Sequence, residues 1–291
     1  MTQLIDSLNA VIDKFDVAVL DQWGVLHRGA GAFPPAVQAV ARLARKGKRT
    51  VVLTNSGKRA EVNRKRIESL GFPKGSINHV VSSGEVAWRD LTTERKLPNS
   101  QPAGALFPVC AAPRDAQDWA DGDPSIVLVD KPELARHLLL MGLPDNTDED
   151  AFDKLFDLAV GRDAGMICTN PDKVSLRGDR RFIAPGFLAR KFAGLGGRVA
   201  WYGKPFSRVF DAVRDLYPDI PRERFLMIGD SMEHDIAGAN RTGFMSMLVT
   251  SGVHGPAIGN AESDRVLRPG IEELARSYGT KMPDFCIRQL R

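Results

Sequence analysis

Four short apolar runs in this sequence are each followed closely by side chains that could do chemistry. These side chains are Asp21 after the run 17–20, Thr54 after 51–53, Lys204 after 199–202, and Asp230 with Asp235 after 225–228. Runs of this length, bounded by turn-forming residues, predict buried parallel strands. Ligands of open parallel sheets bind beyond the carboxyl ends of the strands. We therefore expect these groups to meet at one edge of a sheet, where they suit a divalent cation and a phosphoryl group.

The chemistry of such an edge would depend on three carboxylates and one ammonium group. Asp21 can be a nucleophile, a metal ligand or both. Asp230 and Asp235 would repel Asp21 and raise its pKa unless a cation such as Mg²⁺ lay among them. Lys204 can neutralise phosphoryl charge and hold Asp21 ionised, and the Thr54 hydroxyl can bond a phosphate oxygen. Each residue alone also fits an ordinary role as a helix cap or turn, so the order and placement of the set carry the prediction.

The elements that would position these residues alternate between strand and helix, which is typical of a doubly wound α/β sheet. Main-sheet strands are expected at 16–20, 49–53, 80–81, 198–202, 224–228 and 244–249, and helices at 4–14, 35–46, 58–70, 186–195, 206–216, 234–242 and 270–278. The middle of the chain has strand-like runs at 104–109, 125–129 and 165–168 and helix-like runs at 132–141 and 149–160. We therefore predict a Rossmann-like core domain formed by residues 1–84 and 186–291, with an inserted α/β domain over 85–185.

The bulk composition is that of a soluble globular protein. Of the 291 residues, 43% are hydrophobic and 26% charged, and the net charge of +4 is compatible with an anionic small substrate without requiring one. No apolar run approaches the length of about 20 residues that spans a membrane, and no signal peptide is evident, so we expect a cytoplasmic protein without membrane partners. The three cysteines form no CxxC pair. The basic stretch 59–66 lacks interleaved aromatic residues, so no nucleic-acid partner is expected.

In their order, these residues resemble the motifs of the haloacid dehalogenase superfamily. Its first motif is Asp-x-Asp-Gly, the second a Thr or Ser after a strand, the third a Lys, and the fourth Gly-Asp with a further Asp. The matching residues are Asp21, Thr54, Lys204, Asp230 and Asp235. The long insertion between the second and third motifs resembles subclass IIA, which has a large α/β cap and includes p-nitrophenyl-phosphatase-like, nucleotide and pyridoxal phosphatases. Segments 53–56, 169–172 and 203–205 look like local signatures of that subclass, and the resemblance covers about residues 15–255.

The resemblance implies a two-step hydrolysis of a small phosphate ester through an aspartyl phosphate on Asp21. Magnesium would be held by Asp21, the backbone carbonyl of Trp23 and Asp230, with Asp235 nearby. Thr54 and Lys204 would orient the phosphoryl group. Substrate-binding residues are expected near the cap signatures, namely Asn55, Ser56, Thr169, Asn170 and Asp172. A homodimer through the cap or a sheet edge is compatible with this scheme.

The sequence departs from the family at Trp23. Phosphatases of the family have a second Asp there, which protonates the leaving oxygen and then activates water. An indole cannot exchange a proton near neutral pH. Three interpretations remain open: a phosphatase with a substitute acid such as His27 or with a leaving group that needs little protonation; a carbon–halogen hydrolase, against which the Asp230 and Asp235 pair argues; and a binding or regulatory protein without catalysis.

Overall fold

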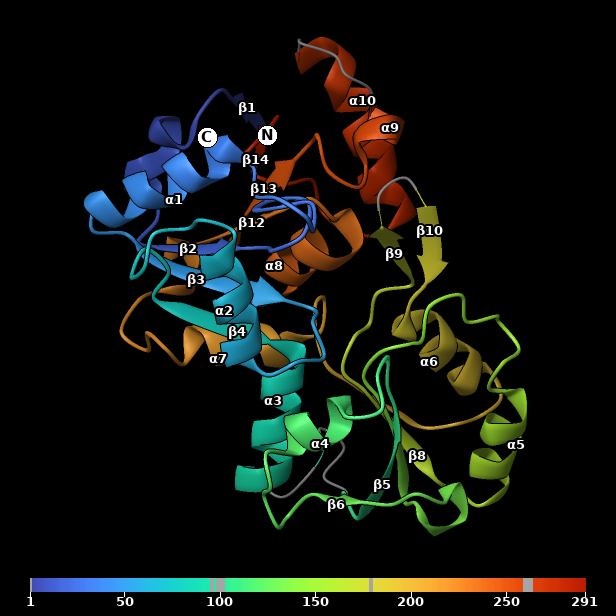
Figure 1. Ribbon diagram of the computed structural model, residues 1–291. Helices are drawn as coiled ribbons and strands as arrows, with labels where there is room; N and C mark the ends of the chain where they lie inside the picture. Colours follow the sequence, from blue (N-terminus) through green and yellow to red (C-terminus); the bar gives the residue numbers. More distant parts are fainter. Residues whose placement is uncertain (1, 95–96, 98–102, 178–179, 259–263) are drawn as a thin grey trace. The chain divides into compact units, whose positions relative to one another are not determined.

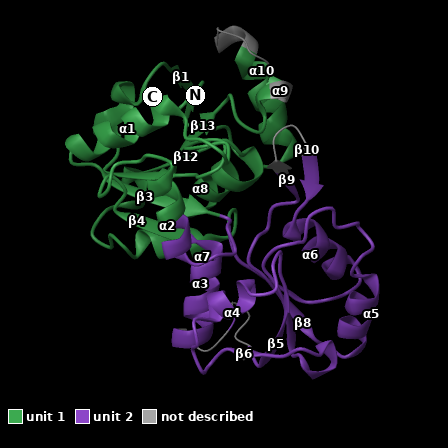
Figure 2. Ribbon diagram, viewed as in Figure 1, with its two compact units in different colours: residues 1–54, 64–81, 204–291 green, residues 55–63, 82–203 purple. Residues whose placement is uncertain are grey.

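A computed structural model of the chain describes residues 2–94, 97, 103–177, 180–258 and 264–291 (Figure 1). The chain divides into two compact units (Figure 2). We call residues 1–54, 64–81 and 204–291 the core unit, and residues 55–63 and 82–203 the cap unit. Each unit is built around its own parallel sheet, so the predicted α/β fold with a core and an α/β cap is confirmed.

The core unit contains a seven-stranded sheet with the order β1-β14-β13-β12-β2-β3-β4. Its strands are β1 (Gln3–Ile5), β2 (Val17–Leu20), β3 (Arg49–Thr54), β4 (His79–Ser82), β12 (Phe225–Gly229), β13 (Met245–Val249) and β14 (Phe285–Ile287). The pairings from β1 through β3 are all parallel. Every residue of β2 and β12 is buried, because both strands lie in the middle of the sheet with neighbours on both sides.

Helices flank the core sheet, and sequence signals explain their ends. The α-helices are α1 (Pro34–Arg45), α2 (Ala60–Ser69), α7 (Ser207–Arg214), α8 (Ala237–Thr242), α9 (Gly255–Ile258) and α10 (Asp264–Ser277). Residues 60–63, the start of α2, belong to the cap unit's segment 55–63. Shorter 3-10 or π turns are η1 (Leu8–Lys14), η4 (Arg222–Arg224) and η5 (Met232–Ile236). Two prolines open α1, Leu43 lies on its buried face, and Gly47 follows its end with a φ of +67°.

The cap unit contains a five-stranded parallel sheet with the order β11-β8-β7-β5-β6. Its strands are β5 (Ala105–Val109), β6 (Val127–Leu128), β7 (His137–Leu140), β8 (Gly165–Cys168) and β11 (Val199–Trp201). A separate antiparallel pair is formed by β9 (Val174–Arg177) and β10 (Arg180–Ile183). Its helices are α3 (Ser83–Arg89), η2 (Asp90–Glu94), α4 (Asp115–Ala120), η3 (Pro132–Leu134), α5 (Asp153–Gly161) and α6 (Pro185–Gly194). Phe156 of α5 meets Phe192 of α6 edge-to-face at 5.5 Å between ring centroids, inside a separate apolar core.

Three sequence predictions are wrong in informative ways. The strand expected at 198–202 forms as β11, but it pairs with β8 in the cap sheet instead of returning to the core sheet. The helix expected at 132–141 is the short turn η3 followed by β7, because the four residues of β7 are buried between two strands. The leading helix expected at 4–14 begins as β1, which pairs with β14, and only then becomes the 3-10 helix η1.

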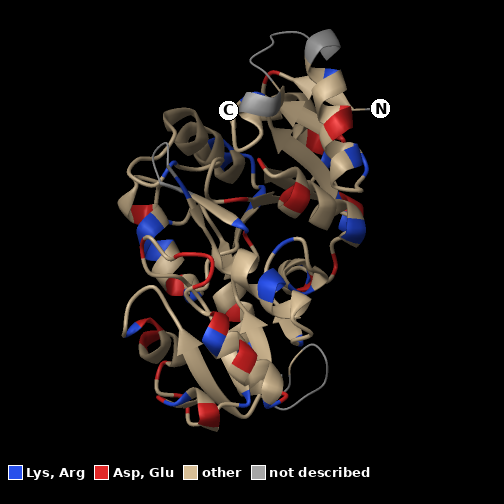
Figure 3. Cartoon of the chain, turned by 90° about the vertical axis from the view of Figure 1, so that its right-hand side faces the viewer, with Lys and Arg blue, Asp and Glu red and all other residues tan. Residues whose placement is uncertain are grey.

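Lysines and arginines are interspersed with aspartates and glutamates on both units (Figure 3). All three cysteines are free. Among the described residues, no helix combines the length and the apolar character needed to cross a bilayer.

Candidate active site

Asp21 stands at the carboxyl end of β2, in the middle of the core sheet. Its backbone N–H donates to the carbonyl of Ile228 at 2.9 Å, which continues the ladder between β2 and β12 by one residue. That hydrogen bond aligns the end of β2 with the end of β12, where Asp230 follows Gly229. The pairing of two central strands therefore places carboxylates from distant parts of the sequence side by side.

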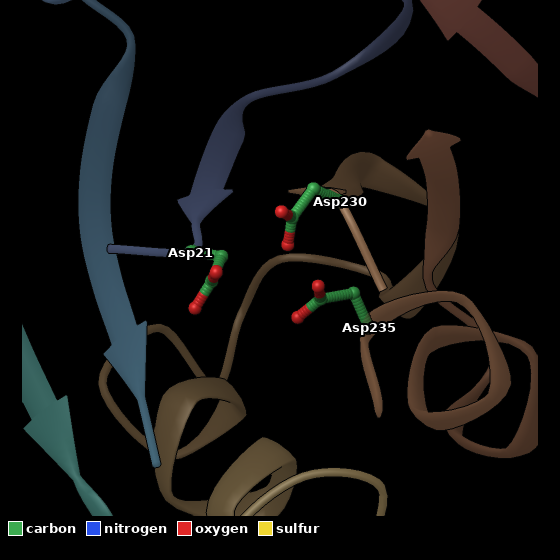
Figure 4. Close-up of side chains that lie close together, drawn as sticks. All are labelled: Asp21, Asp230 and Asp235. Atoms are coloured by element: carbon green, nitrogen blue, oxygen red, sulfur yellow. The ribbon is translucent and has the colours of Figure 1, made fainter. Parts of the chain in front are cut away.

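Three carboxylates gather at this sheet edge (Figure 4). Asp21, Asp230 and Asp235 each offer an oxygen, and these oxygens all lie within 4.8 Å of one another. All three side chains are buried, with exposed fractions of 8%, 8% and 0%. Asp235 joins the group because η5, which begins after Ser231, turns its carboxylate back toward the strand end, where it accepts the Ser231 N–H at 3.0 Å.

The ammonium group of Lys204 lies among these carboxylates. Its Nζ makes a short ion pair with Asp21 Oδ1 and a second ion pair with Asp235 Oδ1 at 2.7 Å. Lys204 itself is 2% exposed. One buried cation thus faces three buried acidic groups, which leaves a local excess of negative charge whenever all three carboxyl groups are ionised.

The electrostatics follow from this imbalance. Burial raises the pKa of Asp21 to about 7, with Asp235 adding to the rise and Lys204 opposing it. Burial together with the neighbouring Asp21 and Asp235 raises the pKa of Asp230 well above its ordinary value. Burial alone would lower the pKa of Lys204, but the attraction of Asp21 and Asp235 raises it above its ordinary value. The cluster would therefore ionise fully only with additional positive charge.

Glycines let the backbone approach these carboxylates closely. A Cβ on Gly24 would lie 2.0 Å from Asp230 Oδ2, and a Cβ on Gly252 would lie 2.2 Å from the same atom. A Cβ on Gly229 would lie 2.1 Å from the carboxyl carbon of Asp235. Asp230 Oδ2 also accepts the Val253 N–H at 2.8 Å. The result is a tightly enclosed set of hard oxygen donors, which fits the preference of Mg²⁺ for carboxylate and carbonyl ligands.

The loop after Asp21 is held by Trp23 and His27. The two rings meet edge-to-face at 4.9 Å, and the guanidinium of Arg66 lies over the Trp23 ring at 5.5 Å from its centroid. Trp23 is 45% exposed, whereas His27 is fully buried. The Gly29 N–H donates to His27 Nδ1 at 3.0 Å, and burial, with Arg66 nearby, lowers the pKa of His27 to about 4. His27 is therefore a neutral residue that supports the loop, which disfavours it as a substitute acid.

The remaining predicted residues separate between the two units. Thr54 ends β3 in the core and is 2% exposed. Asn55 belongs to the cap unit, where its Nδ2 donates to Asp172 Oδ1 at 2.8 Å. The Asp172 N–H in turn donates to Asn170 Oδ1 at 3.0 Å. Asn55, Asn170 and Asp172 thus form one hydrogen-bonded group within the cap.

Two further predicted residues make local contacts. The hydroxyl of Thr169 donates to the Leu140 carbonyl at 3.3 Å and is buried, so this side chain is engaged at the end of the cap sheet. The Ser56 hydroxyl accepts the Lys58 N–H at 3.3 Å, and the Ser56 carbonyl accepts the Gly84 N–H at 3.1 Å. Both residues stabilise the cap backbone, and their contact with a substrate stays a prediction.

The sequence interpretation missed the backbone around Asp230. Gly252 and Val253 follow β13, so the end of this strand contributes to the site as well. Turn-forming residues directly after an apolar run were a usable signal for this end. The role of Gly24 had a signal as well, since it lies within the motif and has a φ of +79°, a conformation that glycine adopts without strain.

Comparisons with known proteins agree with the fold and the geometry. A family described as haloacid dehalogenase-like hydrolase matches residues 18–110, and one described as HAD-hydrolase-like matches residues 201–270. Glycerol-3-phosphate phosphatase of Gallus gallus is 29% identical over 286 residues, covering 91% of this chain and 90% of that protein. Chronophin of Bos taurus is 29% identical over 291 residues, covering 94% and 92%.

A solved structure extends the likeness to the whole fold. The crystal structure of a haloacid dehalogenase-like hydrolase from Brucella suis is 27% identical, with a TM-score of 0.79 over 99% of this chain and 100% of that one. Together the two family matches span more than half of the sequence. The chain belongs to the haloacid dehalogenase-like hydrolases. Within that superfamily, its parallel-sheet cap inserted between the second and third motifs is that of subclass IIA.

Proposed function

We propose that this protein is a magnesium-dependent phosphatase that acts on a small phosphorylated metabolite through an aspartyl phosphate on Asp21. The observation that carries the proposal is the buried cluster of three carboxylates with Lys204 at the ends of β2 and β12. The similarity to a glycerol-3-phosphate phosphatase over most of both chains supports a phosphate ester as substrate. The cluster favours this function over carbon–halogen hydrolysis, because halide displacement would not need a cation site.

Each residue of the site has a role in this mechanism. Asp21 attacks phosphorus as the bond to the leaving oxygen breaks, and Lys204 favours the ionised form of that carboxylate while offering charge to the phosphoryl oxygens. The Thr54 hydroxyl, at the end of the neighbouring strand β3, bonds a phosphoryl oxygen. Asn55, Asn170 and Asp172 of the cap contact the rest of the substrate. Water then attacks the aspartyl phosphate and releases Asp21.

Magnesium would be held by Asp21, Asp230 and the backbone carbonyl of Trp23, with Asp235 beside them. When bound, it would supply the positive charge that the three carboxylates lack and polarise the phosphoryl oxygens. Because Asp235 also bonds Lys204, we expect it to position the ammonium group as well as to lie near the cation.

The test compares Asp21→Asn with Asp16→Asn. Both replace an aspartate bordering β2, but Asp16 lies before the strand and pairs with Arg224 at 2.7 Å on the surface. We expect Asp21→Asn to lower phosphate release by about 10⁴-fold or more, as loss of a nucleophile does, and Asp16→Asn to retain it. Phosphate release is measured over a panel of phosphate esters with Mg²⁺ and with a chelator. Undiminished release by Asp21→Asn would reject the mechanism, as would equal release with the chelator.

A further inference from the structure

The core loop after Asp21 holds few groups that could hand a proton to a leaving oxygen. In the segment 22–33, the side chains with exchangeable protons are those of Gln22, Trp23, His27 and Arg28. The amide, the indole and the guanidinium do not release protons near neutral pH. His27 is therefore the one residue of this loop that could serve as a general acid by its chemistry.

The geometry of His27 prevents that role. Its side chain is fully buried, and its Nδ1 accepts the Gly29 N–H at 3.0 Å, so the ring proton of the neutral imidazole lies on Nε2. Nε2 is enclosed and has no hydrogen-bond partner among the described residues. A proton at that atom is enclosed within the loop, where the His27 ring meets Trp23 edge-to-face.

The other polar groups of the cluster are engaged with one another or with the nearby backbone. Lys204 is held by Asp21 and Asp235 at once. Asp230 accepts the Val253 N–H, and Asp235 accepts the Ser231 N–H. These contacts orient the charged groups of the cluster toward one another.

We propose that the substrates of this enzyme are phosphates whose leaving group departs as a stable anion: acyl phosphates, or aryl phosphates of low leaving-group pKa, in place of alkyl phosphates such as glycerol or sugar phosphates. The inference rests on the proposed phosphatase function and specifies its substrate class. General acid catalysis contributes typically about 10²–10⁴-fold in rate. An alkoxide leaving group would lose that contribution, whereas a carboxylate or an acidic phenolate does not need it.

The bonds and protons balance without an acid. An oxygen of Asp21 forms a bond to phosphorus while the bond to the leaving oxygen breaks, and the electron pair leaves on that oxygen as a carboxylate or phenolate. Water then bonds to phosphorus, the Asp21 carboxylate is released, and the water proton goes to the phosphate product. Because no side chain of the loop activates that water, we expect the aspartyl phosphate to accumulate and the second step to limit kcat.

The leaving-group dependence of kcat/KM is the direct test, because kcat/KM reports steps only up to the departure of the leaving group. The full chain with Mg²⁺ is assayed on substituted phenyl phosphates whose leaving-group pKa runs from about 4 to about 10. Acetyl phosphate represents the acyl phosphates, and glycerol 3-phosphate represents the alkyl phosphates. We expect kcat/KM to fall on the order of tenfold for each unit of leaving-group pKa, because the leaving oxygen bears its full charge. Acetyl phosphate turning over well while every aryl phosphate is slow would assign the acyl class, and the reverse result the aryl class.

Two substitutions at one position refine the test. Trp23→Asp supplies a carboxyl group, and Trp23→Asn supplies the same shape without an acidic proton. We expect only Trp23→Asp to raise the ratio of kcat/KM for glycerol 3-phosphate to kcat/KM for 2,4-dinitrophenyl phosphate, by about 10²-fold or more. An equal gain in both variants would overturn the inference. If neither variant folds, the wild-type series alone decides.

Failure of the inference and failure of the proposed function look different. A shallow slope in the wild type, with glycerol 3-phosphate cleaved as fast as acidic aryl phosphates, would reject the inference, since it requires a proton donor outside the loop, and would leave the phosphatase function intact. No turnover of any substrate, with no phosphate attached to Asp21 by mass spectrometry, would reject the function itself and the inference with it.

Discussion

The core and the cap are both parallel sheets, yet their strand ends differ in chemistry. In the core, β2 and β12 are followed by Asp21 and Asp230, which are charged side chains in a buried cluster. In the cap, β8 is followed by Thr169, whose hydroxyl bonds the Leu140 carbonyl. Burying charge is unfavourable unless it is compensated, whereas a hydroxyl paired to a carbonyl is stable. Sheet topology thus provides the position in both units, and the residue type decides whether that position can do chemistry.

The largest difference in stability between the two units is expected when one buried or partly exposed lysine is replaced in each. Lys204→Met leaves three buried carboxyl groups without a counter-charge, and we expect the free energy of unfolding to fall by about 3–5 kcal/mol. Lys191→Met is the cap control, because Lys191 pairs with Asp153 at 2.5 Å in a partly exposed site and should contribute at most about 1 kcal/mol. Denaturant titrations in chelator and in Mg²⁺ measure both.

Magnesium should separate these two variants further. A cation that binds the native core stabilises it, so the loss caused by Lys204→Met should shrink in Mg²⁺, while the effect of Lys191→Met should not change. If both variants lose the same unfolding free energy and Mg²⁺ changes neither loss, the Lys204 ion pairs of the core would not differ from the Lys191 ion pair of the cap.

Replacing either of two glycines in the core by alanine allows a second comparison, with an expected effect of intermediate size on Mg²⁺ binding. Gly24 and Gly47 both have positive φ, of +79° and +67°, so alanine at either position should cost about 1–3 kcal/mol of stability. Only at Gly24 would the new Cβ meet a carboxylate, since nothing lies within 4 Å of the corresponding point at Gly47. We expect Gly24→Ala to weaken Mg²⁺ binding by about tenfold or more, roughly 1.4 kcal/mol, and Gly47→Ala to leave it unchanged.

Calorimetric titration of Mg²⁺ into each folded variant measures this difference. If Gly24→Ala binds Mg²⁺ as tightly as Gly47→Ala, the cation does not depend on the close approach of this backbone to Asp230, and the proposed ligand set would need revision.

The smallest expected effect concerns how the two units respond to acid. In the cap, His137 Nδ1–H donates to the Ala103 carbonyl at 2.7 Å, and burial lowers the pKa of His137. The folded cap therefore binds a proton less tightly than the unfolded chain, so stability is lost as the pH falls below about 6.5. His137→Asn should flatten this acid-side loss of unfolding free energy.

The metal-free core should respond with the opposite sign. The pKa of Asp21, raised to about 7, means that the folded core binds a proton more tightly than the unfolded chain, so this group loses stability as the pH rises from about 4 to 7. Denaturant titrations of His137→Asn and Asp21→Asn in chelator, at pH 5 and pH 7, separate the two trends. If His137 and Asp21 both changed the unfolding free energy in the same direction between pH 5 and pH 7, the pKa shifts stated for them would be contradicted.

The sequence predicted most of the core because its strands and its polar residues follow local rules. The apolar runs before Asp21 and Asp230 are short, continuous and bounded by turn-formers, and the structure brings the two carboxylates together through the pairing of β2 with β12. The catalytic and metal-binding roles of these residues stay predictions. The buried position of His27 could not be predicted, because burial depends on the packing of Trp23 and Arg66 around it.

The cap was harder to predict for a physical reason. An apolar run such as 137–140 fits a buried helix turn as well as a buried strand, and only its neighbours β5 and β8 decide between them. Membership of β11 in the cap sheet likewise depends on pairing with β8, and no local signal distinguishes one parallel sheet from another. Errors therefore concentrate where long-range pairing, not local pattern, selects the structure.

The order in which the chain is synthesised gives the β2–β12 pairing a further consequence. Arg224, just before β12, bonds Asp16, just before β2, across a separation of 208 residues. Most of the cap, by contrast, is one continuous stretch from residue 82 to 203. During translation the cap sheet can be complete while β2 still lacks its partner on one side, and such distant pairings form slowly and leave apolar strands exposed. We therefore expect the nascent chain to rely on chaperones most while residues 82–225 are emerging, before Asp21 is surrounded by its neighbours in the folded core.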